Sequence, residues 1–155
     1  MTTINPPDHP YYLLSRVTLL VTSAFRKGLV SAGVRDVKPA YLGVLIALWQ
    51  EDGLKVIELG RRAGLEPSSM TGLLDRMERD GLAFRAADPK DRRAQLIYLT
   101  DRGRNSQKTV LEVVDRVMGK IFKEISSDDL SQTLNVLKQI IANAGEGNKF
   151  NLPKN

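Results

Sequence analysis

The chain has 155 residues, of which 42% are hydrophobic and 26% are charged. This composition is typical of a soluble globular protein and excludes a disordered or membrane-embedded chain. There is no cysteine and a single histidine, His9, so disulfides, thiolate catalysis and cysteine zinc sites are excluded. We expect no metal site and no cofactor. The net charge of +5 favours polyanions as partners.

We expect neither a secretory signal nor a membrane anchor. The N-terminal segment MTTINPPDHPYY lacks a basic stretch followed by an apolar one. The longest apolar stretch, Tyr41–Trp49, is far shorter than the roughly 20 residues that cross a bilayer. A cytoplasmic protein without a membrane partner is therefore expected.

Three helices are predicted in the first part of the chain. From Tyr11 onward, apolar residues recur at three- and four-residue intervals and predict a first helix. A second helix is predicted over 39–50, with a proline at its first turn, and a third over 55–62. Residues 1–10 contain three prolines and are expected to form a flexible arm.

A fourth helix and a hairpin are predicted next. The helix spans 67–80, and Gly81 closes it. Strands over 82–87 and 94–99 enclose a charged turn, because Asp-Pro initiates turns. One side of the fourth helix carries the apolar residues Met70, Leu73, Leu74 and Met77, and the opposite side carries Ser68, Gly72, Asp75 and Arg79.

Two longer helices are predicted towards the C-terminus. Thr100 is expected to cap a helix that continues to about Ile125. Ser126 with Asp129 resembles a capping box at the start of the last helix. Residues 145–155 are expected to be a flexible tail.

The third and fourth helices, separated by a glycine turn and followed by a basic hairpin, form the pattern of a winged helix-turn-helix. The basic residues Arg85, Lys90, Arg92 and Arg93 crowd the hairpin. An α-helix fits the major groove of DNA, where base edges are distinguishable, and an arginine on a thin hairpin suits the minor groove. The pattern therefore favours double-stranded DNA as partner, with the fourth helix as the recognition helix.

The segment ELGRRAGLEPSSMTGLLDRMERDGLAFRAADPKDRRAQLIYLTDRGR, Glu58 to Arg104, resembles the MarR family of bacterial transcriptional regulators. Its most specific part is 88–103, where Asp91-x-Arg93 is followed by an apolar strand and Leu-Thr-Asp-x-Gly. The resemblance implies a mainly α fold with two regions. A winged helix-turn-helix DNA-binding domain with a small β-hairpin wing covers 39–100, and an α-helical dimerisation region is built from the N- and C-terminal helices, 11–36 and 101–144.

The resemblance also implies roles for individual residues. Arg93 is expected in the minor groove, Arg92 on a phosphate, and Asp91 is expected to fix the wing by pairing with an arginine. Gly72 departs from the family, where many relatives carry a polar or basic side chain, so the base preference does not carry over. The expected DNA-binding residues are Ser68, Ser69, Thr71, Arg76, Lys90, Asp91, Arg92 and Arg93.

A homodimeric, sequence-specific repressor of transcription is the function that the resemblance implies, with a pseudo-palindromic operator and, often, a small anionic or phenolic effector. The apolar faces of the terminal helices need a partner, which a second copy supplies. Val117 is expected in that interface. An arginine beside aromatic rings suits an aromatic carboxylate, so the effector site is predicted at Tyr12, Arg16, Tyr41 and Trp49.

Several alternatives remain open at this point. Tyr41 and Trp49 could belong to the core with Arg16 on the surface, and the terminal helices could form a monomeric core. The protein could be a constitutive DNA-binding protein without an effector, or its winged helix could bind RNA or protein. No local pattern pairs a nucleophile with a base or clusters carboxylates, so we expect neither catalytic residues nor an enzyme.

Overall fold

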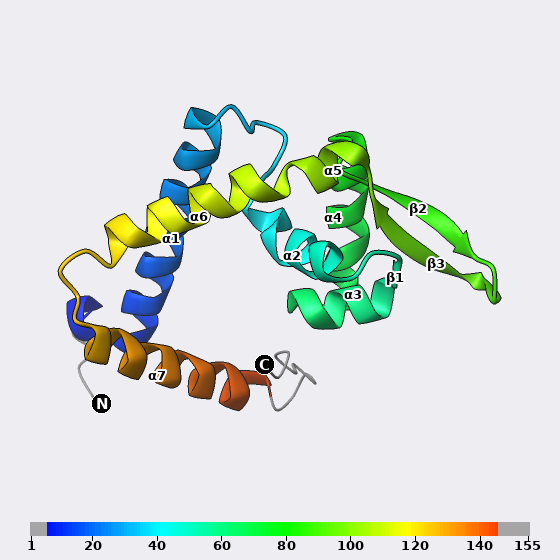
Figure 1. Cartoon of the computed structure of the whole chain (residues 1–155). Helices are drawn as coiled ribbons and strands as arrows, with labels where there is room; N and C mark the ends of the chain where they lie inside the picture. The colour runs from blue at the N-terminus through cyan, green and yellow to red at the C-terminus, as the bar shows by residue number, and fades with distance from the viewer. Residues whose placement is uncertain (1–5, 146–155) are drawn as a thin grey trace.

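The computed structural model describes residues 6–145 (Figure 1). Of the termini predicted to be flexible, residues 1–5 and 146–155 lie outside the described part. The elements in chain order are η1 (Pro6–Asp8), α1 (Pro10–Ser31), η2 (Pro39–Tyr41), α2 (Leu42–Gln50), β1 (Leu54–Lys55), α3 (Val56–Ala63), α4 (Pro67–Arg79), β2 (Ala83–Asp88), β3 (Asp91–Leu99), α5 (Asp101–Asn105), α6 (Gln107–Ile121) and α7 (Ser127–Gly145), where η marks a 3-10 helix.

The molecule has a compact part and an extended part (Figure 1). Helices α2, α3 and α4 with the sheet form the compact part, from which the β2–β3 hairpin projects. Helices α1 and α6 cross and pack against one another, and α7 begins near the start of α1, at the end farthest from the hairpin, and runs back below the compact part in this view. The helices and the hairpin predicted from periodicity are therefore present as a winged helix-turn-helix. Among the described helices, none has the length and apolar character needed to cross a membrane.

The sheet has three antiparallel strands in the order β1-β3-β2. Strand β1 was not predicted, because two residues carry no periodicity; Leu54 pairs with Ile97. The hairpin turn is shorter than predicted. Strand β3 begins at Asp91, so the turn consists of Pro89 and Lys90 alone, and the arginines that follow belong to the strand.

One continuous core joins α1 and α6 to the winged helix-turn-helix. Phe25 of α1 and Val113 of α6 are buried in it together with residues of α2, α3 and α4. The two helices approach closely at Gly28, where a Cβ atom would lie 2.8 Å from Val113 Cγ1 and 3.1 Å from Val117 Cγ2. Val117 is 8% exposed in the protomer. Its expected place in a dimer interface is therefore wrong, because the protomer's own helices already bury it.

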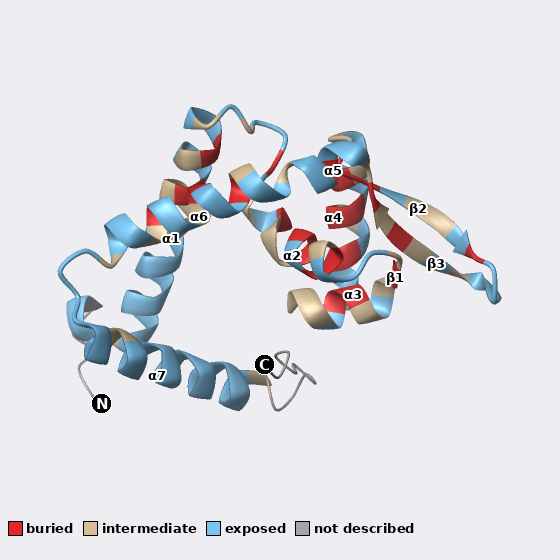
Figure 2. Cartoon of the chain, viewed as in Figure 1, coloured by how far each residue is buried: buried red, intermediate tan, exposed pale blue. Residues whose placement is uncertain are grey.

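The C-terminal helices also differ from the prediction. The single helix expected to run to Ile125 is two helices, α5 and α6, and α6 ends at Ile121. Ser126 makes half of the expected capping box: its hydroxyl accepts from Asp129 N at 3.1 Å and donates to the Asp129 carboxylate at 2.7 Å. No residue of α7 is buried, as the pale blue ribbon in Figure 2 shows.

Candidate nucleic-acid interface

Helix α4 is positioned by its apolar face. The four side chains predicted to point inward are at most 4% exposed. The turn that precedes α4 is left-handed at Gly64, with φ +73°, and Leu65 N donates to Gly60 O at 2.8 Å. The opposite face is open to solvent along its length. The candidate recognition residues on this exposed face are Ser68, Ser69, Thr71 and Arg76.

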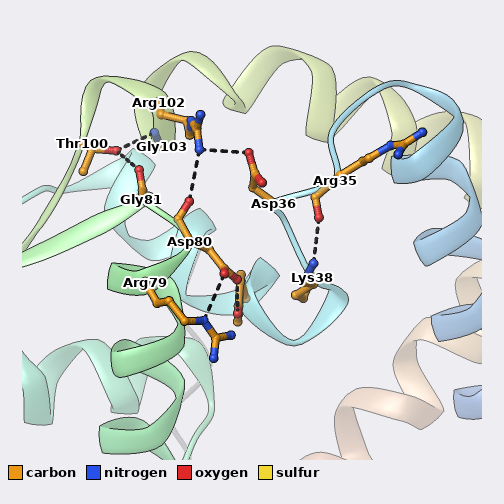
Figure 3. Close-up of polar contacts among 10 residues, drawn as sticks. Arg35, Asp36, Lys38, Arg79, Asp80, Gly81, Thr100, Arg102 and Gly103 are labelled. Carbon is orange, nitrogen blue, oxygen red and sulfur yellow. Dashed lines mark hydrogen bonds and ion pairs between the residues drawn. The ribbon is translucent and has the colours of Figure 1, made fainter.

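The C-terminal end of α4 is tied to two other parts of the chain. Tyr41 of η2 is 1% exposed, and its hydroxyl donates to Asp80 Oδ2 at 2.7 Å. Arg102 of α5 bridges Asp80 O and, at 3.1 Å, the carboxylate of Asp36 in the α1–α2 connection (Figure 3). The Tyr41 hydroxyl lowers the pKa of Asp80, while burial and this carboxylate raise the pKa of Tyr41. Polar contacts therefore hold the end of the recognition helix to η2 and α5.

The middle of α4 is tied to the wing through Arg85. This side chain, on β2, is 20% exposed. Its guanidinium pairs with Asp75 Oδ1 at 2.8 Å and with the Glu78 carboxylate, and its backbone N donates to Glu78 Oε1 at 2.9 Å. The sequence groups Arg85 with Lys90, Arg92 and Arg93 as one cluster of basic residues on the hairpin. The structure instead places it between strand and helix, where acidic residues engage it.

The tip of the wing carries the remaining basic residues. Lys90, Arg92 and Arg93 are exposed, and none of them forms an ion pair with another described residue. The hairpin extends away from the helices, so its tip is not packed inside the molecule (Figure 1). Asp91 does not pair with an arginine as expected: its Oδ1 accepts from Arg93 N at 3.0 Å. This bond shapes the start of β3.

Asp88 anchors the wing, a role that sequence analysis missed. Asp88 is 6% exposed, and it is the single charged residue of the described chain that is buried. Oδ1 accepts from Lys90 N at 2.9 Å, and Oδ2 lies 3.5 Å from Lys55 Nζ on β1. The hydrogen bond from Lys90 N and, to a smaller extent, the ammonium group of Lys55 hold the pKa of Asp88 below its usual value. The sequence offered no signal, because the burial depends on the unpredicted strand β1.

The base of the wing is fixed by Asp52, which was also missed. Its Oδ1 accepts from Leu99 N at 2.9 Å, and its Oδ2 pairs with Arg104 at 2.7 Å. Nearby, Trp49 Nε1 donates to Gly103 O at 2.9 Å. These bonds join the end of α2 to the end of β3 and to α5, so the wing leaves the compact part at a defined place.

The predicted effector residues do not come together within one protomer. Tyr41 is buried and Trp49 packs against the core, whereas Tyr12 and Arg16 are exposed near the start of α1, at the far end from α2. A cavity of about 190 Å³ lies elsewhere, between α1, α2 and α6. Its lining is apolar apart from one hydroxyl: Val21, Thr22, Phe25, Pro39, Leu42, Val114, Val117 and Met118. Within residues 6–145 there is no group of three or more His, Cys, Asp or Glu that could hold a metal ion.

Replacing Asp88 with asparagine tests the anchor of the wing. The folded-state pKa of Asp88 lies below the unfolded-state value of about 3.9. Its contribution to stability is therefore fully present above pH ~4 and is lost as pH falls through the folded-state pKa. Urea unfolding from pH 7 to pH 3 should show Asp88→Asn less stable than wild type at neutral pH, with the difference shrinking below pH ~4. A difference that stays constant over this range would contradict the role.

Comparison with known proteins agrees with this geometry. The sequence profile of the MarR family matches residues 39–94. The regulator TtmR of Methylorubrum extorquens is 48% identical over 66 residues, 43% of this chain but 33% of that protein. The transcriptional repressor MdtR of Bacillus subtilis is 29% identical over 146 residues, covering 92% of this chain and 94% of the relative.

Two solved structures share the whole fold. A MarR family regulator from Rhodococcus sp. RHA1 has a TM-score of 0.72 and 30% identity, covering 90% of this chain and 96% of that chain. The repressor CouR, solved on a 23-mer DNA duplex, has a TM-score of 0.75 and 26% identity over 86% of this chain and 93% of its own. The chain thus has a winged helix-turn-helix with an exposed recognition helix, and it is similar to these regulators. It therefore belongs to the MarR family of DNA-binding transcriptional regulators.

Proposed function

We propose that the protein is a homodimeric repressor that binds a pseudo-palindromic DNA operator through α4 and the wing. The observation that carries the proposal is the pair Arg92 and Arg93, exposed and without an ionic partner in the described chain, on a hairpin joined to the recognition helix. Most other arginines of the winged helix-turn-helix pair with carboxylates. Arg92 and Arg93 can therefore bind DNA without breaking an ion pair inside the described chain.

The two elements suit different parts of one duplex. The small hydroxyls of Ser68, Ser69 and Thr71 lie on the first turns of α4, and hydroxyl groups there suit phosphate and base oxygens in the major groove. Arg76 follows on the same exposed face. A narrow minor groove concentrates negative potential, which attracts the guanidinium groups of the wing. We propose base contacts from α4 and minor-groove and phosphate contacts from the wing.

Replacing Arg93 with alanine should weaken operator binding, because each lost phosphate-type contact releases one counterion fewer. The slope of log K against log salt should fall by about one. Fluorescence anisotropy with a duplex selected from a random pool measures both. Lys123→Ala is the matched control, because this exposed lysine follows α6, at the end of the molecule opposite the wing. Unchanged affinity of Arg93→Ala across the salt titration would remove Arg93 from the interface.

A second copy of the chain is the partner that the terminal helices fit. Helix α7 buries no residue, yet Leu134, Leu137 and Ile141 recur on it at helical spacing and are 37–47% exposed. The first turns of α1 expose apolar residues in the same way, including Leu13 and Val17. Burying these faces in a dimer removes apolar area from water. It also supplies two recognition helices, which a palindromic operator mirrors.

Replacing Leu137 with glutamate should convert the dimer to monomers, because burial of an unpaired charge opposes association. Sedimentation velocity at one fixed protein concentration measures the species. Gln139→Glu adds the same charge on nearly the opposite side of α7 and should leave the dimer intact. A dimer that survives Leu137→Glu would contradict this use of α7.

Repression without catalysis is the mode of action that we propose. MdtR and CouR both carry the name of transcriptional repressors. A repressor needs only to occupy its operator, in the compartment that holds the DNA, so we propose a cytoplasmic location. The roles proposed for these residues are contacts with DNA, and none of them is a chemical reaction on the DNA.

The cavity between α1, α2 and α6 is the effector site that we propose, in place of the four residues expected from sequence. Pro39 and Leu42 line it and flank Tyr41, whose hydroxyl holds Asp80 at the end of α4. A ligand that displaces η2 would therefore shift the recognition helix. The lining contains Thr22 but no basic residue, which favours a phenol over a carboxylate.

Phenol should therefore raise the melting temperature of the protein, because a ligand that binds the native state stabilises it. Benzoate at the same concentration should raise it less. Val114→Phe, which fills the cavity, should abolish the phenol shift, whereas Gln139→Glu should retain it. Equal melting curves with and without either compound would instead favour a constitutive DNA-binding protein without a small aromatic effector.

A further inference from the structure

We propose that Arg85 is a positioning residue for DNA recognition. It fixes α4 relative to the wing and neutralises two carboxylates that would otherwise oppose DNA binding. The inference rests on the proposed function and adds to it a residue that is not expected to touch the duplex. Arg85 lies on β2, between the recognition helix and the projecting hairpin.

The contacts of Arg85 run along one edge of α4. Its guanidinium reaches Thr71 O at 3.4 Å, Asp75 Oδ1 at 2.8 Å and the carboxylate of Glu78. These three residues are spaced by four and three positions, so they lie above one another on the helix. A single planar group therefore holds two turns of the recognition helix to the strand that leads into the wing.

The backbone of the same residue adds a further bond. Arg85 N donates to Glu78 Oε1 at 2.9 Å, while the guanidinium of Arg85 engages Glu78 Oε2. Both oxygens of one carboxylate are thus occupied by one residue. Because the strand's backbone takes part, the register of β2 against α4 is fixed together with the side chain.

Charge gives Arg85 its second role. The side chain of Asp75 is 61% exposed and that of Glu78 is 33% exposed, whereas that of Arg85 is 20% exposed. The carboxylates therefore reach solvent more than the cation that pairs with them. Without Arg85, α4 would carry two uncompensated negative charges close to a polyanion, and like charges brought together in an interface oppose binding.

A lysine cannot fill both roles. Its ammonium supplies a point charge, whereas the guanidinium presents its donors in a rigid planar fork. Arg85→Lys retains the positive charge but loses the simultaneous hold on the helix. Arg85→Gln loses both the charge and the fork. Arg85→Gln combined with Asp75→Asn and Glu78→Gln removes the carboxylate charges together with the cation.

The test compares these three variants with wild type by anisotropy, on a selected duplex and on a random duplex, as a function of salt. Arg85→Gln should bind both duplexes more weakly, by roughly tenfold on the selected one. The triple variant should regain affinity for the random duplex but not the preference for the selected one. Arg85→Lys should bind the random duplex like wild type and lose part of that preference. The salt slope of Arg85→Gln should fall, because salt screens the repulsion between the two uncompensated carboxylates and the DNA. The slopes of Arg85→Lys and the triple variant should stay at the wild-type value or above it, because no phosphate contact is removed.

Three results would overturn the inference. A slope that falls by about one in Arg85→Gln and stays equally low in the triple variant would make Arg85 a phosphate contact. Unchanged affinity and preference in both Arg85→Gln and Arg85→Lys would leave it a structural residue, whatever happens to the melting temperature. A triple variant that binds the random duplex no better than Arg85→Gln would exclude the charge role. If wild type itself binds no duplex, the proposed function fails. If wild type binds the selected duplex and one of the three results above is obtained, only the role of Arg85 fails.

Discussion

The burial of one face of α4 is the constraint on which the rest of the structure depends. Met70, Leu73, Leu74 and Met77 are almost fully excluded from water, so the helix cannot rotate about its axis without exposing part of the core. The face that remains in solvent is thereby determined. It carries small hydroxyls and an arginine, which are groups that read DNA edges and phosphates.

Both ends of the functional surface are held by polar contacts that the core does not provide. The C-terminal end of α4 is bound through Asp80 to Tyr41 and Arg102, and the wing is bound through Asp88 to Lys55. The first set links the recognition helix to η2 and α5, and the second links the hairpin to β1.

The position of each cation matters more than the total charge. Arg61 and Arg62 pair with Glu58 and hold its pKa at about 2, and Arg62 also pairs with Glu51, so both cations already have acidic partners inside the domain. Arg85 likewise forms its ion pairs inside the domain, between β2 and α4. The wing tip, in contrast, keeps its arginines in solvent. A modest net charge thus becomes a concentrated positive tip on an otherwise balanced domain.

Local patterns predicted the helices and the two faces of α4, because periodicity reports burial directly. Strand β1 was missed, since its existence depends on pairing with Ile97, far along the chain. Strand β1 also carries Lys55, the ionic partner of Asp88, which no pattern around Asp-Pro could indicate. Val117 was misplaced because an apolar stripe shows that a face is buried but not which helix covers it. The ion pairs of Arg85 could not be predicted for a similar reason, because its acidic partners, Glu78 and Asp75, lie seven and ten positions earlier.

The central claim, that α4 and the wing engage one duplex together, is tested most directly by hydroxyl-radical footprinting on a selected operator. Wild type should protect two half-sites about one helical turn apart and the minor-groove positions that flank them. Removing both tip arginines, Arg92→Ala with Arg93→Ala, should erase the flanking protection and leave the central protection in place. Flanking protection that persists in this double variant would contradict the account.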